Sequence, residues 1–332
     1  MDRAYLGRTG VRVSRLILGC GNFGGVGSAP AFFGKGDTRE LAFAVMDAAW
    51  EAGITTFDTA DAYGGGRSES WIGDWLRTKG PDVRDALVLT TKTYNPMAEG
   101  ADRGLAPARV RRQLESSLAR LGVERVDLFL AHEWDPEVPV AETAGALDEL
   151  VAEGKIGAYG LSNVDGAQLR EALGPGSFGW VQNSYSLLER EAEREVLPLC
   201  AEHGLGFTPF SPLAGGWLTG KYRRGEPPPQ GSRMTLRPEP YAHLRSGEVF
   251  AGLERLAGLA GEWLEAPAAD ASAGMATLAL AWLLSDPRVG AVVVGPRRPA
   301  HLRPAVDAAR LRLDEARRQE LSALWPAPEP AA

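Results

Sequence analysis

The sequence predicts a single parallel (β/α)8 barrel that takes up the whole chain, residues 1–332. Short apolar runs alternate with longer segments of helical period almost to the end of the chain. Eight such apolar runs occur, and no linker long enough to separate two domains is found before residue 220. Eight β/α repeats in a chain of this length favour a barrel over an open, doubly wound sheet.

The expected strands start with a β-hairpin, in which Tyr5–Gly7 and Val11–Val13 flank a turn at Thr9-Gly10. Barrel strands are then expected wherever a short apolar run suits burial on both faces of a parallel sheet. These runs are Leu16–Cys20, Ile54–Asp58, Leu87–Lys92, Val126–Ala131, Ile156–Leu161, Gly179–Gln182, Leu205–Thr208 and Ala291–Val294.

The segment from Pro107 to Gly122 illustrates how the intervening helices are predicted. Pro107 suits the first position of a helix, where its missing N–H costs no hydrogen bond. Apolar side chains then recur on one helical face, at Val110, Leu114, Leu118 and Leu121. Gly122 can end the helix in a left-handed conformation. The same pattern predicts helices within 40–53 and 139–154, each followed by a strand.

Two long stretches depart from this repeat, Gly24–Gly36 and Arg223–Gly247, and the second is expected to be structureless. Because both follow strands, we expect them on the C-terminal face, where barrel enzymes have their active sites. Gly19–Gly24 matches the G-x-G-x-x-G pattern of dinucleotide-binding Rossmann folds. That fold needs a helix directly afterwards, and Gly25–Pro30 cannot begin one, so we interpret the glycines as a turn.

The composition excludes several classes of function. Apolar residues make up 44% and charged residues 24% of the chain, as in an ordinary globular protein. A net charge of -7 argues against nucleic acid as a partner. No apolar stretch approaches the ~20 residues of a membrane span, and Met1–Gly10 lacks the apolar run of a signal peptide. Cys20 and Cys200 are too few for a disulfide framework or a thiolate metal site, so a cytoplasmic setting is expected.

Candidate catalytic residues are the polar side chains at the C-terminal ends of the predicted strands. Asp58 ends the second strand with Tyr63 soon after it, Lys92 ends the third, and His132 follows the fourth. Each has a plainer interpretation, such as a turn cap, a loop aromatic or a structural histidine. Lys92 is the most informative, because only five of the 36 basic residues are lysines. Because all four residues lie at or just after the C-terminal ends of predicted strands, they are expected at the same level of the barrel and together indicate one site.

This set suits acid catalysis on a carbonyl group. A phenol has an ordinary pKa of about 10, so Tyr63 would be a weak acid on its own. We expect the Lys92 ammonium to stabilise the phenolate and lower the pKa of Tyr63, and Asp58 to hold that ammonium in place. His132 would orient or polarise the carbonyl oxygen. Since no residue donates hydride, a nicotinamide cofactor must bind.

These residues also resemble a known family. The segment from Phe57 to Gly64, Thr91-Lys92, the strand-end His132 and Gly160–Asn163 are similar to the aldo-keto reductase superfamily, and the likeness extends from Tyr5 to about Leu302. That resemblance implies carbonyl reduction by NADPH with an Asp, Tyr, Lys and His tetrad. Its counterparts in this sequence are Asp58, Tyr63, Lys92 and His132.

The resemblance also implies a set of cofactor-binding residues. Ser162, Asn163 and Gln182 are expected to hold the carboxamide, and Phe210 to stack on the nicotinamide. The pyrophosphate would be bound by Ser211, Leu213, Gly215 and Lys221, and the ribose by Gly21 and Asn22. Gly295 with Arg297 or Arg298 would form the 2'-phosphate site. A solvated basic face is the alternative for the two arginines. His301 and Ala305 stand where the family has Gln and Asn, which is a departure at the adenine end.

The leading hypothesis is therefore an enzyme that reduces a small aldehyde or ketone with NADPH. The alternative is a regulatory subunit that binds NADPH and acts on a partner protein, and a third is a barrel that binds nucleotide without catalysis. The substrate would be set by Gly24–Gly36, Tyr94–Gly104 and Arg223–Gly247. Trp134, Trp217 and Phe33 would form an aromatic pocket there or else belong to the core.

Overall fold

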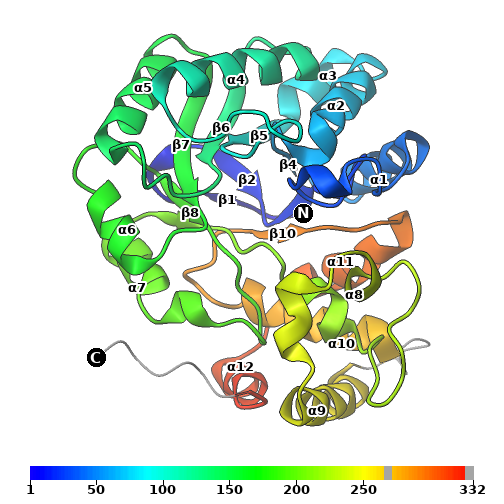
Figure 1. Cartoon of the computed structure of the whole chain (residues 1–332). Coiled ribbons are helices and arrows are strands. Elements are labelled where there is room, and N and C mark those ends of the chain that lie inside the picture. The colour runs from blue at the N-terminus through cyan, green and yellow to red at the C-terminus, as the bar shows by residue number, and fades with distance from the viewer. Residues whose placement is uncertain (265–270, 326–332) are drawn as a thin grey trace.

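The computed structural model describes residues 1–264 and 271–325. Its main element is one curled sheet of eight parallel strands (Figure 1). The strands are β3 (Leu16–Gly19), β4 (Thr56–Asp58), β5 (Val88–Thr93), β6 (Val126–Ala131), β7 (Ile156–Ser162), β8 (Trp180–Gln182), β9 (Gly206–Phe207) and β10 (Val292–Val294). Each overlaps the run of the sequence from which it was predicted, so the prediction of eight parallel strands is confirmed.

The strand order is β10-β3-β4-β5-β6-β7-β8-β9, and all seven neighbouring pairs are parallel. Backbone hydrogen bonds also run between the two ends of this order. The Gly290 N–H donates to the Phe207 carbonyl at 2.8 Å, and the Val293 N–H donates to the Pro209 carbonyl at 2.9 Å. Every strand therefore points its carboxyl end to the same side of the molecule.

The predicted hairpin is present and lies against the amino ends of the strands. β1 (Arg3–Tyr5) and β2 (Arg12–Ser14) are antiparallel, and Gly10 adopts φ +72° in the turn between them. Leu6 and Val13 are fully buried. They pack with the inward-facing residues of the strands, which include Ile17, Leu128, Leu130, Trp180 and Val293. The hairpin thus fills one end of the sheet and leaves the carboxyl ends of the strands for a site.

Helices cover the outside of the sheet (Figure 1). The α-helices of the described residues are α1 (Arg39–Glu51), α2 (Arg67–Arg77), α3 (Pro81–Ala86), α4 (Pro107–Leu121), α5 (Val140–Ala152), α6 (Gly166–Ala172), α7 (Val196–Glu202), α8 (Arg233–Leu236), α9 (Gly247–Trp263), α10 (Ala271–Leu284), α11 (Arg303–Arg310) and α12 (Glu315–Ser322), of which α8 lies in the long loop after β9. In α4 the predicted apolar face is buried, and Gly122 ends the helix at φ +70° with its N–H donating to the Leu118 carbonyl. Full burial of one such leucine contributes roughly 1.5–3 kcal/mol. No described helix is both long and apolar enough to span a bilayer.

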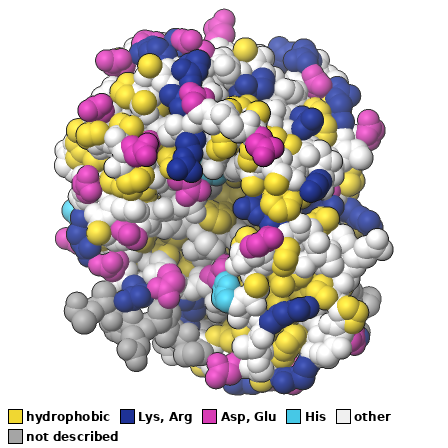
Figure 2. Space-filling view, viewed as in Figure 1, with side chains coloured by type: hydrophobic (Ala, Val, Ile, Leu, Met, Phe, Trp, Pro, Cys, Tyr) yellow, Lys and Arg dark blue, Asp and Glu magenta, His cyan; other side chains and the backbone are white. Residues whose placement is uncertain are grey.

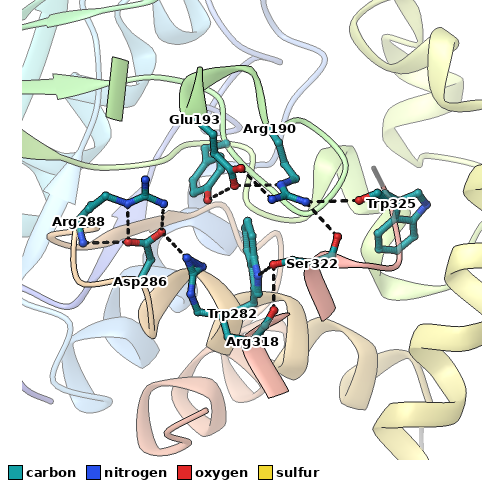
Figure 3. Close-up of polar contacts among 9 residues, drawn as sticks. Arg190, Glu193, Trp282, Asp286, Arg288, Arg318, Ser322 and Trp325 are labelled. Atoms are coloured by element: carbon teal, nitrogen blue, oxygen red, sulfur yellow. Dashed lines mark hydrogen bonds and ion pairs between the residues drawn. The ribbon is translucent and has the colours of Figure 1, made fainter. Parts of the chain in front are cut away.

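A buried polar network fixes the C-terminal helix α12 to the rest of the molecule (Figure 3). The Asp286 side chain is 1% exposed and accepts hydrogen bonds from Arg288 at 2.7 Å and Arg318 at 3.1 Å. Arg190, which follows β8, donates to the backbone carbonyl of Ser322 at 3.0 Å. Because these charges are paired, the network stabilises the position of α12 without leaving a buried carboxylate unsatisfied.

The two long loops differ in how well they were predicted. Gly24–Gly36 contains a 3-10 helix at Pro30–Phe32 but no α-helix, and the first α-helix after β3 begins only at Arg39, as the rejection of the Rossmann pattern requires. The expectation that Arg223–Gly247 is structureless is wrong, because it contains α8 and a 3-10 helix at Glu239–Leu244. Its prolines and glycines had hidden these short helical turns. Seen as in Figure 1, the surface is hollowed near its middle (Figure 2).

Candidate active site

The four candidate catalytic residues converge at the carboxyl ends of neighbouring strands. Asp58 is the last residue of β4, Lys92 is the next to last of β5, and His132 follows β6 directly. Tyr63 begins a 3-10 turn that leaves β4. Asp58, Lys92 and His132 are buried, with 3%, 1% and 6% exposure, whereas Tyr63 is partly exposed. The strand-end prediction therefore places four side chains from three consecutive connections in one group.

Asp58 and Lys92 form a buried ion pair. The Lys92 Nζ donates to Asp58 Oδ2 at 2.6 Å and to the Thr59 carbonyl at 2.9 Å. Burial by itself would lower the pKa of Lys92, but the Asp58 charge and the neighbouring Tyr63 raise it above its ordinary value. Lys92 is therefore a fixed positive charge, and it lies 5.1 Å from the centre of the Tyr63 ring.

Tyr63 is held between this cation and the first loop. A Cβ added to Gly21 would lie 3.5 Å from the Tyr63 ring, so the loop backbone packs against the phenol. Burial raises the pKa of Tyr63, and the Lys92 charge opposes that rise without overcoming it. Lys92 thus lowers the pKa of Tyr63 as expected, but desolvation of the phenolate is the larger effect, so the pKa lies above its ordinary value. Tyr63 consequently stays protonated at neutral pH.

His132 packs edge-to-face against Tyr63, with ring centres 5.5 Å apart and planes at 76°. Burial and the Lys92 charge lower the pKa of His132 well below its ordinary value, so the imidazole is neutral at neutral pH. Its Nδ1 faces the Asn95 side-chain nitrogen at 3.4 Å. An Asn95 N–H donated to Nδ1 assigns the proton of the ring to Nε2. His132 then has one N–H free to donate to an oxygen atom.

The residues predicted as a carboxamide clamp lie beside this group. Gln182, at the end of β8, donates from Nε2 to Asp58 Oδ1 at 3.0 Å and is 3% exposed. Ser162 ends β7 and is 1% exposed. Asn163 adopts φ +56° and donates from Nδ2 to the His132 carbonyl at 2.9 Å and to Ser162 Oγ at 3.2 Å. Amide and hydroxyl groups from neighbouring strands are thus gathered next to the tetrad.

A tightly turned segment at residues 211–216, called the cradle below, follows β9. Phe210 is partly exposed and packs on the inward-facing residues of the strands, while Leu213 packs on the main core. Beyond Phe210, positive φ angles occur at Ser211 (+53°), Ala214 (+46°), Gly215 (+62°) and Gly216 (+94°). Within this segment the N–H groups of Ala214 and Gly216 donate to the Ser211 and Leu213 carbonyls, both at 2.8 Å, so its own backbone bonds hold the turn in shape. The Ser211 hydroxyl is fixed by a 2.8 Å hydrogen bond to the Tyr241 hydroxyl.

A cluster of positive side chains lies near this cradle. The charges of Arg297 and Arg233, together with burial, lower the pKa of Lys221. Arg233 donates to Asn22 Oδ1 at 3.1 Å, and Asn22 lies next to Gly295. Arg297 is paired with the Asp37 carboxylate at 3.0 Å. Lys221 and Arg233 form no ion pair with a carboxylate among the described residues. A phosphate would supply the missing negative charge.

His301 belongs to the same region. Its Nδ1 accepts a hydrogen bond of 3.4 Å from the Arg297 backbone N–H, and burial together with nearby cations lowers its pKa. His301 is therefore neutral and adds no positive charge to the cluster. Its contact with Arg297 places it beside the predicted 2'-phosphate site.

The three aromatic residues considered for the substrate do not form one pocket. Trp217 is 1% exposed and packs against Tyr222 and Phe250, so it belongs to the core. The Phe33 ring lies against the backbone of Gly65. Trp134 packs partly buried against the main core. The interpretation as core residues is therefore the better one for Trp217, and no shared aromatic pocket can be built from the three.

Sequence reasoning missed several residues of the region. Asn95 lies three residues beyond Lys92, and the rule that selected the strand-end residues could have found it. Burial raises the pKa of Glu133 to about 7, and this carboxyl accepts a hydrogen bond from the clamp. Arg233, Asp37 and Tyr241 come from long loops, where no periodicity in the sequence indicates which side chains face the site.

The donor set fits a nicotinamide dinucleotide. Amide and hydroxyl groups that suit a carboxamide lie beside the tetrad. Lys221 and Arg233, which form no ion pair among the described residues, supply positive charge that suits a phosphate group.

Comparison with known proteins identifies the family of the chain. The Aldo/keto reductase family model matches residues 15–326. An uncharacterized oxidoreductase of Bacillus subtilis is 38% identical over 99% of this chain and 97% of its own length. An Escherichia coli protein named NADH-specific methylglyoxal reductase is 31% identical over 95% and 96%. A probable voltage-gated potassium channel subunit beta of rice is 34% identical over 89% and 87%. Both the family match and these identities show that this chain belongs to the aldo/keto reductase family.

Proposed function

We propose that this protein reduces the carbonyl group of an aldehyde or ketone to an alcohol with NADPH, and that Tyr63 is the proton donor. As a member of its family the protein is an oxidoreductase, and such enzymes use nicotinamide cofactors. The observation that carries the proposal is the convergence of the tetrad. Lys92 lies 2.6 Å from Asp58 and 5.1 Å from the centre of the Tyr63 ring, with His132 against the same ring.

The tetrad divides the work of proton transfer among its members. Tyr63 is protonated at neutral pH and donates its hydroxyl proton to the carbonyl oxygen as that oxygen gains negative charge. Lys92 stabilises the phenolate that remains, and Asp58 keeps the ammonium of Lys92 in place. The neutral His132 donates its Nε2–H to the same oxygen and orients it. When bound, the nicotinamide supplies the hydride that reduces the carbonyl carbon.

The chain offers one group for each part of the cofactor. Ser162, Asn163 and Gln182 would hold the carboxamide, because their amide and hydroxyl groups lie beside the tetrad. The remaining contacts would come from Phe210, Ser211, Leu213, Gly215, Lys221, Gly21, Asn22, Gly295, Arg297 and His301. The cation cluster favours NADPH over NADH because only NADPH carries a 2'-phosphate. One relative is named NADH-specific, and titration of this protein with NADPH and with NADH tests the preference.

We further propose that the sheet is a closed (β/α)8 barrel and that residues 1–332 form one domain. The support is the pair of backbone hydrogen bonds that link the β9 region to the β10 region. A closed barrel fixes the relative heights of all eight strand ends. Such a scaffold would hold Asp58, Lys92 and His132 in register.

A regulatory subunit is the second candidate function. The observation in its favour is the 34% identity to a rice protein named as a probable voltage-gated potassium channel subunit beta. Such a protein would bind NADPH and act on a partner, with little turnover. The complete tetrad favours the reductase, since a pure sensor needs no buried ion pair beside a protonated phenol.

The test is the oxidation of NADPH, followed at 340 nm, with a panel of simple aldehydes, aryl ketones and keto-sugars. Tyr63→Phe should lower kcat roughly 10²–10⁴-fold, the usual contribution of a general acid. NADPH affinity should stay nearly unchanged. Tyr5→Phe is the matched control, because Tyr5 is 66% exposed on the hairpin at the other end of the sheet.

The outcomes separate the two functions. Turnover that depends on Tyr63 establishes the reductase, and the best substrate of the panel identifies the carbonyl class. Full kcat in Tyr63→Phe removes Tyr63 from the role of acid. NADPH binding without turnover on any member of the panel favours the regulatory function, and co-purification with a partner would then support it.

A further inference from the structure

Asp37 is a buried carboxylate in the region proposed for the adenosine end of the cofactor. It lies at the end of the first loop, just before α1, and its side chain is 3% exposed. Oδ1 accepts a hydrogen bond from Arg297 Nε at 3.0 Å. Oδ2 is shielded from solvent and has no hydrogen-bond partner among the described residues. A carboxylate so placed needs a nearby cation, and Arg297 supplies it.

Arg297 is engaged from two sides. Besides the bond from Nε to Asp37, its Nη1 donates to the Gly231 carbonyl at 2.6 Å. A guanidinium binds phosphate best through two parallel N–H groups on one edge. The edge formed by Nε and Nη2 is shared with Asp37, and the edge formed by Nη1 and Nη2 is shared with Gly231. Neither edge is free for a two-point contact in this arrangement.

The other charges around Asp37 are positive. The Asp37 carboxyl interacts electrostatically with three arginines, Arg297, Arg233 and Arg298. Two of these, Arg297 and Arg233, also interact with Lys221. Among the described residues, none of Arg233, Arg298 and Lys221 forms an ion pair with a carboxylate. The single acid among several cations therefore lies beside the arginine that was expected to recognise the 2'-phosphate.

We infer that Asp37 sets the cofactor preference of this enzyme by occupying Arg297 and opposing the charge of a 2'-phosphate. This inference rests on the proposed function and names a specificity-determining residue for it. NADH carries no 2'-phosphate, so Asp37 opposes only NADPH. The cation cluster and Asp37 thus act in opposite directions, and the enzyme accepts NADH more readily than its arginines alone would indicate.

A competing role for Asp37 predicts the opposite result. If Asp37 merely holds Arg297 in position for the phosphate, its loss would weaken NADPH binding. Asp37→Asn distinguishes the two, because asparagine keeps the size of the side chain and an oxygen to accept from Arg297, while the charge is removed. At an effective dielectric constant near 20, removal of one unit charge about 12 Å from a phosphate corresponds to roughly a tenfold change in affinity, and a shorter distance gives a larger change.

The experiment is a calorimetric titration of the full-length enzyme with NADPH and with NADH, without substrate. We expect Asp37→Asn to lower the Kd for NADPH by about tenfold or more and to leave the Kd for NADH within about twofold. Asp47→Asn is the matched control, because Asp47 lies on α1 in an ion pair with Lys79 outside this region. A second variant, Arg297→Gln, should raise the Kd for NADPH more than that for NADH.

Each result bears on a different part of the reasoning. Weaker NADPH binding by Asp37→Asn, or an equal change for both nucleotides, overturns the assignment of Asp37. If wild-type protein bound neither nucleotide, the proposed function itself would fail, and the assignment with it. Melting curves of both variants show whether they are folded, and Arg297→Gln tests the same contact if Asp37→Asn is not.

Discussion

Asp61 provides a test of the buried region behind the tetrad. It lies two residues before Tyr63 and is 0% exposed. One of its carboxylate oxygens accepts from the Ala62 N–H and the other from the Thr93 hydroxyl, both at 2.6 Å. Burial, together with the negative charge of Glu69, raises the pKa of Asp61 from 3.8 to about 7. The folded protein therefore binds this proton more tightly than the unfolded chain does.

The sign of the pH dependence follows from this difference. The contribution of Asp61 to stability is most favourable below pH 3.8, where both states are protonated. It declines by up to about 1.4 kcal/mol per pH unit as the pH rises toward 7, because the unfolded chain releases the proton first. Asp61→Asn cannot ionise and escapes this loss. Relative to wild type, the variant should gain roughly 2.5 kcal/mol of unfolding free energy between pH 5 and pH 8.

The assay is urea unfolding of wild type and variant at pH 5 and pH 8, followed by circular dichroism. Asp47→Asn is the control, because its carboxylate is partly exposed, 45%, and paired with Lys79. It should show no gain at the higher pH. If Asp61→Asn gains no more than the control, Asp61 is ionised in the folded protein throughout this range, and the argument from burial is wrong.

Three further changes test other parts of the structure. Lys92→Met should lower the unfolding free energy by about 3–5 kcal/mol, because it leaves the buried Asp58 carboxylate unpaired. Denaturation of the double variant with Asp58→Leu should show that much of this free energy is recovered. Asn95→Leu should lower kcat roughly tenfold with an unchanged NADPH Kd, since His132, in its proposed role, loses the donor that fixes its proton on Nε2. A changed Kd would point to a structural role. Burial opposes ionisation of Asp286, but hydrogen bonds from Arg288 outweigh burial and lower its pKa from 3.8. The ionised Asp286 therefore stabilises the folded protein at pH 7, and this contribution is lost as the pH falls below 3.8. Asp286→Asn should therefore destabilise the protein more at pH 7 than at pH 3 in thermal melts, and an equal loss at both would contradict this.

The strands and the tetrad could be predicted because both depend on regular geometry. A parallel strand buried on two faces is a short apolar run, and eight such runs occur in the sequence. In the structure Asp58 pairs with Thr90, and Lys92 pairs with Leu130, so neighbouring strands end at nearly the same level. Polar residues at these ends therefore had to lie close together. The direction of the pKa of Tyr63 was not predictable, because it depends on the depth of burial.

The loops could not be predicted in the same way, since no period relates their residues to one another. Arg297 pairs with Asp37 across 260 positions of the chain, and Arg233 reaches Asn22 across 211. A sequence shows that an arginine is present near the expected phosphate site, but it does not show that a carboxylate from another loop already occupies that arginine. The proposed tetrad thus lies on strand ends, where the sequence predicts it. The proposed control of cofactor preference rests on contacts between loops, and for that the three-dimensional structure is needed.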